Sequence, residues 1–311
     1  METPQKNREA VGHVMVLTTI LIYSFNTNFM KILMPEWIGP HGLVLVRCAI
    51  MAFGFWIVSF FIPVSKQQAK PGRKDVLMMM LGGLLGIGGN LLLYINGLNI
   101  TGPVDAFVIR TVQPIIVIGL AVLILHAEFN RYKAIGIILG LAGTLYVSIT
   151  PHAGIVKDSF TGDVLILVSS VLTALYLILI KPYTQKFNSV IVMRWMSLAG
   201  FILVLPFGLH QVLHAPLFTT EAPVHIWLEL GFVLVFATMI AYFLNLKALQ
   251  YISPFVESVY IYLLPVTGAI VSISLGLQKF SWHDPIALIL IIAGFLLINK
   301  KKKAKATISK V

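Results

Sequence analysis

The sequence predicts an all-α membrane protein that crosses the bilayer ten times, as two inverted repeats of five helices. Two observations lead to this prediction. Hydrophobic residues make up 58% of the 311 residues and charged residues only 11%, with a mean hydropathy of +0.91. In addition, the stretch from Gly97 to Thr144 recurs without a gap from Ala248 to Phe295.

The composition places the chain in a lipid bilayer. In soluble domains charged residues alone make up about a quarter of the sequence. An apolar segment needs roughly 20 residues to cross about 30 Å of hydrocarbon, and in lipid its backbone groups must pair internally. The apolar runs are continuous rather than alternating, which excludes a transmembrane β-barrel. Cys48 is the only cysteine, so there is no disulfide framework and no cysteine metal cluster.

Five apolar segments are expected in the first repeat, residues 12–150. They cover about Gly12–Met34, His41–Pro63, Val76–Ile95, Pro103–Leu125 and Ala134–Ile149. The first is too long for a signal peptide and lacks a small-residue cleavage site, so it is expected to be retained. Glycines crowd the third segment, at residues 81–90, and small residues four apart favour close helix packing.

The second repeat, residues 161–299, follows a polar link, TPHAGIVKDSFTGD, and has the same order. Its segments cover about Val164–Ile180, Val190–Leu209, Trp227–Leu249, Pro254–Leu277 and Pro285–Ile298, and a basic tail, residues 300–311, ends the chain. Because five is an odd number, the second repeat enters the membrane from the opposite side and is therefore inverted.

The charges predict the orientation. With the N-terminus in the cytoplasm, the inner side carries Lys6, Arg8, Lys66, Lys70, Arg73, Lys74, Arg131, Lys133, Lys181, Lys186, Lys247 and the six lysines from Lys300 to Lys310. Only Lys157 and Lys279 fall outside, with Lys31 near that end of the first segment. This bias is the positive-inside pattern, so both termini are expected in the cytoplasm. The net charge of +11 thus follows membrane topology and does not indicate nucleic acid.

Two prolines recur in the middle of apolar segments. Pro114 and Pro265 each stand eleven residues after the proline that begins the segment, which is about 16 Å along a helix. A proline there frees a carbonyl one turn earlier. Matched interruptions near the midplane of an inverted repeat point to a transport site, whereas two tolerated kinks are the structural alternative.

Arg110 is the deepest cation in the sequence. It stands seven residues past Pro103, roughly 10 Å below the outer boundary. Its own helix offers no acidic residue one turn away, so its partner must come from another helix, from water or from a substrate. Glu257 begins its segment from the opposite face and is expected to be a poor direct partner.

Asp105 and Glu257 lie in the first turns of their segments, where the helix dipole favours carboxylates. Capping explains both residues, and proton coupling is the functional alternative, because ionisable groups inside a membrane are functional candidates. Arg47 and Arg194 are expected to snorkel or to bond nearby carbonyls.

No motif supports catalysis. His210 and His214 have metal-compatible spacing, but they lie in an expected outer loop without a third ligand, so no metal or cofactor is predicted. Phosphate loops, metalloprotease motifs and nucleophile triads are absent from the sequence. A membrane enzyme would need clustered acids and bases near an interface, and a passive scaffold would need neither matched midplane prolines nor a deep arginine.

The order of these features resembles the ten-helix EamA-type members of the drug/metabolite transporter superfamily. The resemblance extends from about Gly12 to Asn299. Its carriers are the polar end of the first segment with Lys31, Arg47, the turns GLNITGP and ALQYISP, Pro114 and Pro265, Glu128, Gly143 and Gly294. Family members often carry Gly-Glu after the ninth helix, where this chain has Leu277, Gln278 and Lys279.

The resemblance implies a secondary transporter in the inner (plasma) membrane, commonly an exporter of amino acids or related carboxylates, that alternates access to a central cavity. Its partners would be the lipid bilayer, a small-molecule substrate and protons. The residues expected around the cavity are Asn26, Asn28, Asn90, Tyr94, Arg110, Gln113, Tyr176, Tyr242, Asn245 and Tyr260. The alternative is an exchanger of phosphorylated or nucleotide-linked sugars, which would present more than one deep cation.

Overall fold

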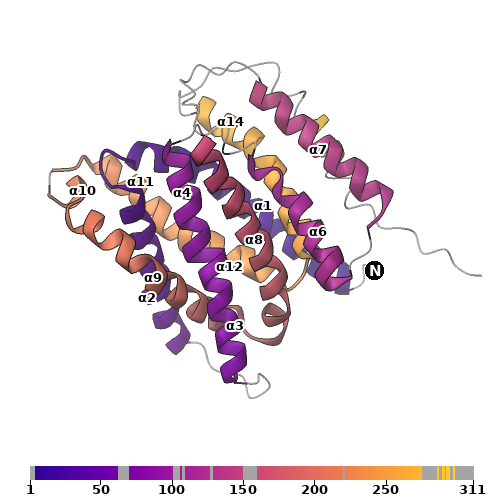
Figure 1. Ribbon diagram of the computed structural model, residues 1–311, viewed down its shortest axis with the longest axis horizontal. Coiled ribbons are helices and arrows are strands. Elements are labelled where there is room, and N and C mark those ends of the chain that lie inside the picture. The colour runs from indigo at the N-terminus through magenta and orange to yellow at the C-terminus, as the bar shows by residue number, and fades with distance from the viewer. Residues whose placement is uncertain are drawn as a thin grey trace, which may run out of the picture.

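The computed structural model describes residues 4–61, 70–100, 106, 109–126, 129–149, 160–219, 221–274, 286, 289–290, 292–294 and 297. Within these residues the secondary structure is helical throughout (Figure 1). The link at 150–159, half of the tenth expected segment and the tail at 300–311 lie outside this description, as does Asp105.

The first half contains six α-helices and one π-helix in the described part of the chain. They are α1 (Pro4–Leu33), α2 (Pro40–Phe61), α3 (Arg73–Gly83), the π-helix η1 (Leu84–Gly89), α4 (Asn90–Ile100), α6 (Gln113–Leu125) and α7 (Arg131–Ile149). Together, α3, η1 and α4 form one rod in which the π-helix replaces two turns of α-helix. Such π-segments occur frequently at functional sites.

The second half repeats this order. Its described elements are α8 (Phe160–Lys186), α9 (Ser189–Leu213), α10 (Pro216–Thr219), α11 (Val224–Leu234), the π-helix η2 (Val235–Ile240), α12 (Ala241–Ala248), α13 (Pro254–Val259), the 3₁₀-helix η3 (Tyr260–Leu263) and α14 (Leu264–Ser274). The short α10 lies in a stretch that the sequence analysis assigned to a loop.

Six helical rods among the described residues are long and apolar enough to cross a membrane. They are Asn7–Leu33, Pro40–Phe61, Arg73–Ile100, Phe160–Lys186, Ser189–Leu213 and Val224–Ala248. Even the shortest, α2, has 22 residues, which is about 33 Å at 1.5 Å per residue. These spans confirm a polytopic, all-helical membrane protein.

The structural elements recur at the spacing of the sequence repeat. The π-helices begin at Leu84 and Val235, and the helices α6 and α14 begin at Gln113 and Leu264. Both pairs are 151 residues apart (235 − 84 and 264 − 113). Since a π-helix is rare, its presence at the same place in both halves is a structural sign of duplication.

Two lysines make matching contacts in the two halves. The Nζ of Lys31 donates to the Leu98 carbonyl oxygen at 3.0 Å, while the Nζ of Lys181 donates to the carbonyl oxygens of Leu249 and Ile252. Leu98 and Leu249 are themselves 151 residues apart. Each lysine therefore satisfies a carbonyl at the end of a helical rod, where the helix offers no further backbone donor.

The two halves are interleaved rather than separate. Helix α2 packs along α9, while α1 contacts α12 and α4 contacts α8. In Figure 1, α2 and α9 lie on one side of the molecule and α6, α7 and α14 on the other, with α1, α8 and α12 between them. Helix α1 of the first half therefore packs against the second half, and helix α8 of the second half packs against the first.

Close packing by glycine occurs where η1 meets α9. A Cβ added to Gly83 would overlap the Met196 carbonyl oxygen, and one added to Gly88 would lie 3.0 Å from the Gly200 Cα. Missing side chains at these positions let the two helices approach backbone to backbone, as the sequence analysis expected.

Both recurring prolines stand in the first turn of a helix instead of kinking a continuous one. Ile109 and Arg110 are helical, Thr111 and Val112 form a turn, and α6 then starts with Pro114 in its first turn. In the second half, η3 intervenes and α14 starts with Pro265 as its second residue. Proline is well suited to the first turn, because the amide hydrogen that it lacks would have no acceptor there.

Candidate functional site

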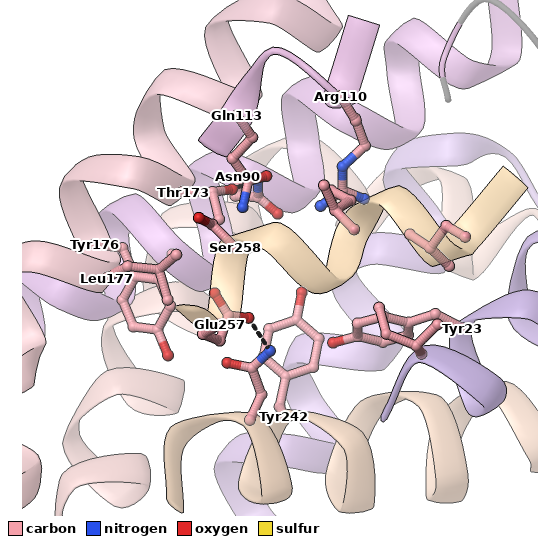
Figure 2. A pocket seen from close by; sticks show the side chains of 15 residues that line it. Tyr23, Asn90, Arg110, Gln113, Thr173, Tyr176, Leu177, Tyr242, Glu257 and Ser258 are labelled. Atoms are coloured by element: carbon pink, nitrogen blue, oxygen red, sulfur yellow. Dashed lines mark hydrogen bonds between the residues drawn. The ribbon is translucent and has the colours of Figure 1, made fainter. Parts of the chain in front are cut away.

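A pocket lies between the two halves, beside both interruptions. Its volume is about 70 Å³. The walls come from α1, the η1–α4 rod, the segment around Gln113, α8, α12 and the broken helix α13–η3–α14. Figure 2 shows Arg110, Gln113, Asn90 and Thr173 on one side of this space, and Glu257 and Tyr242 on the other. The pocket thus gathers polar side chains from sequence positions far apart.

Arg110 provides positive charge to the pocket. Its guanidinium carbon lies 4.5 Å from the centre of the Tyr94 ring, which is a cation–π contact. The Nε atom is buried and has no hydrogen-bond acceptor among the described residues. Of the partners that the sequence analysis left open, another helix therefore supplies one, the aromatic face of Tyr94.

Glu257 provides negative charge. It is 8% exposed, and its Oε1 accepts a hydrogen bond from Asn245 Nδ2 at 2.6 Å. Its Oε2 is buried, and no described residue donates a hydrogen bond to it. The N-terminus of α13 is capped by Ser253, whose Oγ accepts from the Val256 amide at 3.2 Å. The observed cap is therefore Ser253, and Glu257 is directed to Asn245 and the pocket instead.

Arg110 and Glu257 line one pocket, although the sequence analysis placed Glu257 near the opposite face of the membrane. The expectation that Glu257 is a poor direct partner of Arg110 agrees with the structure. The two residues interact electrostatically, but no ion pair within 4.0 Å joins these two described residues. The estimate from the sequence treated Glu257 as fixed at one face of the membrane. The break at η3 and the inward direction of α13 bring its side chain to the centre of the molecule.

A second arginine lies behind the wall of the pocket. Arg47 is only 2% exposed, and its Nε donates to Thr238 Oγ1 at 2.8 Å. Its Nη2 reaches the carbonyl oxygen of Ala237, in the π-helix η2, at 3.5 Å. Its charge lies near Tyr23 and Tyr242, which line the pocket. Arg47 therefore forms hydrogen bonds inside the protein rather than snorkelling to the membrane surface, and its charge adds positive potential at the pocket.

Six of the ten residues expected around the cavity line this pocket: Asn90, Arg110, Gln113, Tyr176, Tyr242 and Asn245. Asn90 Nδ2 donates to the Ser169 carbonyl oxygen at 3.0 Å. The Oε1 of Gln113 is buried without a donor in the described part of the chain. Polar atoms on both sides of the pocket are thus left for a bound molecule.

The other four expected residues do not line the pocket. Tyr94 lies beneath Arg110, and the Tyr260 hydroxyl forms a 2.6 Å hydrogen bond with His13 Nδ1. Asn28 Nδ2 donates to the Ser24 carbonyl oxygen at 3.1 Å, and Asn26 is buried beside Met30 on α1. Asn26 and Asn28 lie three and five residues after Tyr23, which lines the pocket from α1 together with Ile20.

Three polar lining residues were missed. Tyr23, Thr173 and Ser258 line the pocket together with the expected ones. Two of them could have been predicted from helical periodicity, because residues three apart lie on the same face of a helix. Tyr23 lies three residues before Asn26, and Thr173 lies three residues before Tyr176. Ser258 follows Glu257 directly.

The two histidines with metal-compatible spacing are not in a loop. Helix α9 continues to Leu213, so His210 lies in its last turn and His214 follows it as the cap residue. Both are exposed, with ring centres 4.4 Å apart. The i, i+4 spacing is therefore that of one helix face.

The comparisons with known proteins agree with this architecture. The model of the EamA-like transporter family matches residues 10–149 and again residues 160–300. The uncharacterized transporter YyaM of Bacillus subtilis is 23% identical over 84% of this chain and 84% of its own length. An uncharacterized transporter of Archaeoglobus fulgidus is 26% identical over 93% of this chain and 98% of its own length.

A solved crystal structure shares the fold. It superposes with a TM-score of 0.73 at 18% identity, covering 93% of this chain and 96% of that chain. At this identity the likeness concerns the fold alone. The family model, in contrast, matches almost the whole chain, once in each half. The chain therefore belongs to the EamA-like transporter family and is a multi-pass membrane transporter rather than an enzyme.

Proposed function

We propose that this chain is a secondary transporter that exports small organic carboxylates, amino acids foremost, by alternating access to the pocket described above. The observation that carries the proposal is the pairing of Arg110 and Glu257 in one pocket. Each has a buried hydrogen-bonding atom without a partner among the residues that the structure describes, Nε on the first and Oε2 on the second. A zwitterion supplies the two groups that these atoms lack.

Arg110 is assigned to the substrate carboxylate. A guanidinium offers a planar set of donors that matches a carboxylate, and its contact with Tyr94 holds that plane in place. Arg47 adds a second buried positive charge, so the described residues in and behind the pocket carry two cations and one carboxylate. This surplus of positive charge favours a substrate that brings a negative group.

Glu257 is assigned to the substrate ammonium group and to the coupling proton. A buried carboxylate is costly when it is charged and unpaired, so it holds either a proton or a cation. A substrate ammonium group would therefore compete with a proton for Oε2. Such competition exchanges protons for substrate and would couple export to the proton gradient. Asp105, the other coupling candidate, is not among the described residues.

The repeated elements support alternating access. Matched broken helices at the interface of two repeats are typical of transporters that rock one half against the other. The breaks before α6 and α14 stand 151 residues apart, and both flank the pocket through Gln113 and Leu264. Two inverted five-helix repeats, residues 12–150 and 161–299, with both termini in the cytoplasm of a plasma membrane, fit these breaks and the lysine distribution.

The alternative substrates, phosphorylated or nucleotide-linked sugars, fit the pocket less well. A volume of about 70 Å³ accommodates a small solute, while drug-sized ligands occupy roughly 300–1,000 Å³. Among the described lining residues Arg110 is the one cation, whereas a phosphate or diphosphate would call for more.

A ligand panel tests the proposal. Because a ligand stabilises the folded state that binds it, thermal unfolding of the purified protein is followed with matched sets: an amino acid, its deaminated keto acid, its decarboxylated amine and a nucleotide sugar. We expect the amino acid to stabilise most, the keto acid less, and the amine and the nucleotide sugar not at all. Stabilisation by nucleotide sugars alone would overturn the assignment.

A further inference from the structure

We propose that Arg194, Trp56 and Trp195 form a binding site for the phosphate group of an anionic phospholipid, at the membrane surface where α2 ends and α9 begins. This site is separate from the pocket, and the inference does not depend on which substrate is transported.

The three side chains form one stack. The Arg194 guanidinium carbon lies 4.8 Å from the Trp56 ring centre and 5.1 Å from that of Trp195. The two indoles meet edge to face, with centres 5.7 Å apart. A cation over an aromatic face is attracted to it, so the two rings fix the direction of the guanidinium. Its Nη1 also lies 3.5 Å from Ser59 Oγ.

Apart from Ser59 Oγ, the cluster contains hydrogen-bond donors without acceptors among the described residues. The Nε of Arg194 and both indole Nε1 atoms are buried without a hydrogen-bond partner among the described residues. Lys186 pairs with Asp75, while Arg194 forms no ion pair with an acidic residue in the part of the chain that the structure describes. Because the indole nitrogens are buried, the half-buried guanidinium is the group that presents the charge. An anion is the component that this cluster lacks.

The position of the cluster selects a lipid as the source of that anion. Arg194 stands five residues after the start of α9 and Trp56 five residues before the end of α2, which is about 7.5 Å inside each helix end at 1.5 Å per residue. This is the depth at which hydrocarbon gives way to headgroups. Tryptophan and arginine are typical of this layer, and basic sites between helices bind lipid headgroups there.

The surroundings are suited to acyl chains. Phe53, Ile57 and Phe60 of α2 are 62%, 58% and 77% exposed. A free phosphate would have to leave water for a site next to this apolar surface, whereas a phospholipid brings its phosphate and covers the apolar side chains at the same time. The shared chemistry is a phosphate oxygen on a guanidinium, and the phospholipid is the source that also fits these neighbours.

Fluorescence quenching tests the site directly. The protein has five tryptophans, so replacing Trp37, Trp227 and Trp282 by Phe leaves Trp56 and Trp195 as the reporters. This variant is reconstituted in mixed vesicles of phosphatidylglycerol and phosphatidylcholine in which either one lipid or the other carries bromine. We expect brominated phosphatidylglycerol to quench about fivefold more effectively per molecule, as one basic residue near an anionic lipid allows.

Substitutions then test whether the guanidinium of Arg194 causes the preference for phosphatidylglycerol. Arg194→Gln should make the two lipids quench equally, Arg194→Lys should keep part of the preference, and Arg73→Gln, an exposed arginine at the start of α3, should change nothing. If Arg194→Gln does not fold, the comparison of parent with Arg194→Lys decides, since loss of the stacked guanidinium must lower the preference. Excess inorganic phosphate should not displace the lipid.

Three results would overturn the proposal. Equal quenching by the two lipids in the parent would show that there is no headgroup preference. Loss of quenching on adding inorganic phosphate would assign the cluster to a free anion. If neither brominated lipid quenches Trp56 and Trp195, and the protein has the mass of a dimer in detergent, this surface is an interface with a second copy of the chain.

Discussion

Replacing Arg110 by Ala removes the cation on which the carboxylate assignment rests. The guanidinium is held over Tyr94 and keeps an unpaired Nε in the pocket, so the loss is that of at least one hydrogen bond to a charged group. Such a bond contributes about 1.5–3 kcal/mol, which corresponds to roughly tenfold to more than a hundredfold in affinity. Arg110→Lys should recover only part, because an ammonium lacks the planar donor set.

The assay is substrate-induced thermal stabilisation of the purified variants at equal monodispersity, with the best amino acid of the panel. Arg73→Ala is the matched control and should bind as the parent does, since Arg73 is exposed at the start of α3. Loss of Arg110 leaves Glu257 without a nearby described cation in the pocket, so Arg110→Ala with Glu257→Gln provides a charge-balanced second variant. A folded Arg110→Ala protein that binds the amino acid as tightly as the parent would refute the reasoning.

Three further predictions concern the pocket, the breaks and the orientation. Glu257→Gln should weaken amino acid binding about tenfold, as for a lost charged hydrogen bond, and leave keto acid binding unchanged in the same thermal assay; equal loss for both ligands would remove the ammonium assignment. Replacing Pro114 or Pro265 by Ala should reduce the transport rate in vesicles while expression is largely retained, and normal turnover in both variants would make these prolines structural only. Lys157→Cys, in a chain whose Cys48 is replaced by Ala, should be labelled from outside the cell and a cysteine in the tail only after permeabilisation; labelling of both from one side would rule out ten spans.

Much of the fold could be predicted from the sequence, because a membrane-spanning helix is recognised by its length and its apolar residues. The duplication fixed the correspondence between the halves, and the π-helices at Leu84 and Val235 follow it. The π-helix at Val235 was not predictable, since Thr238 and Arg47 bond the carbonyl oxygens of Val233 and Ala237 around it only in the folded protein. Helix ends were also missed, as at His210, where α9 runs on past the apolar stretch.

The candidate site was predicted in part, because polar residues in apolar helices are few and tend to face the interior. Arg110 and Gln113 were found in this way. Glu257 was placed at a membrane face by its position after Pro254, and only the three-dimensional path of α13 shows that it reaches the same pocket as Arg110. Tyr260 shows the opposite error, since a tyrosine near the expected cavity is instead bonded to His13.

Transport in proteoliposomes tests the central claim most directly. The purified parent is reconstituted, a proton gradient is imposed, and uptake of the labelled amino acid with the highest affinity is followed against the keto acid and a nucleotide sugar. We predict saturable, gradient-driven transport of the amino acid that is lost in Arg110→Ala, and that in Glu257→Gln persists as substrate exchange but no longer responds to the gradient. Gradient-driven amino acid transport of parental rate in both variants, or no transport of any carboxylate by the parent, would contradict the account.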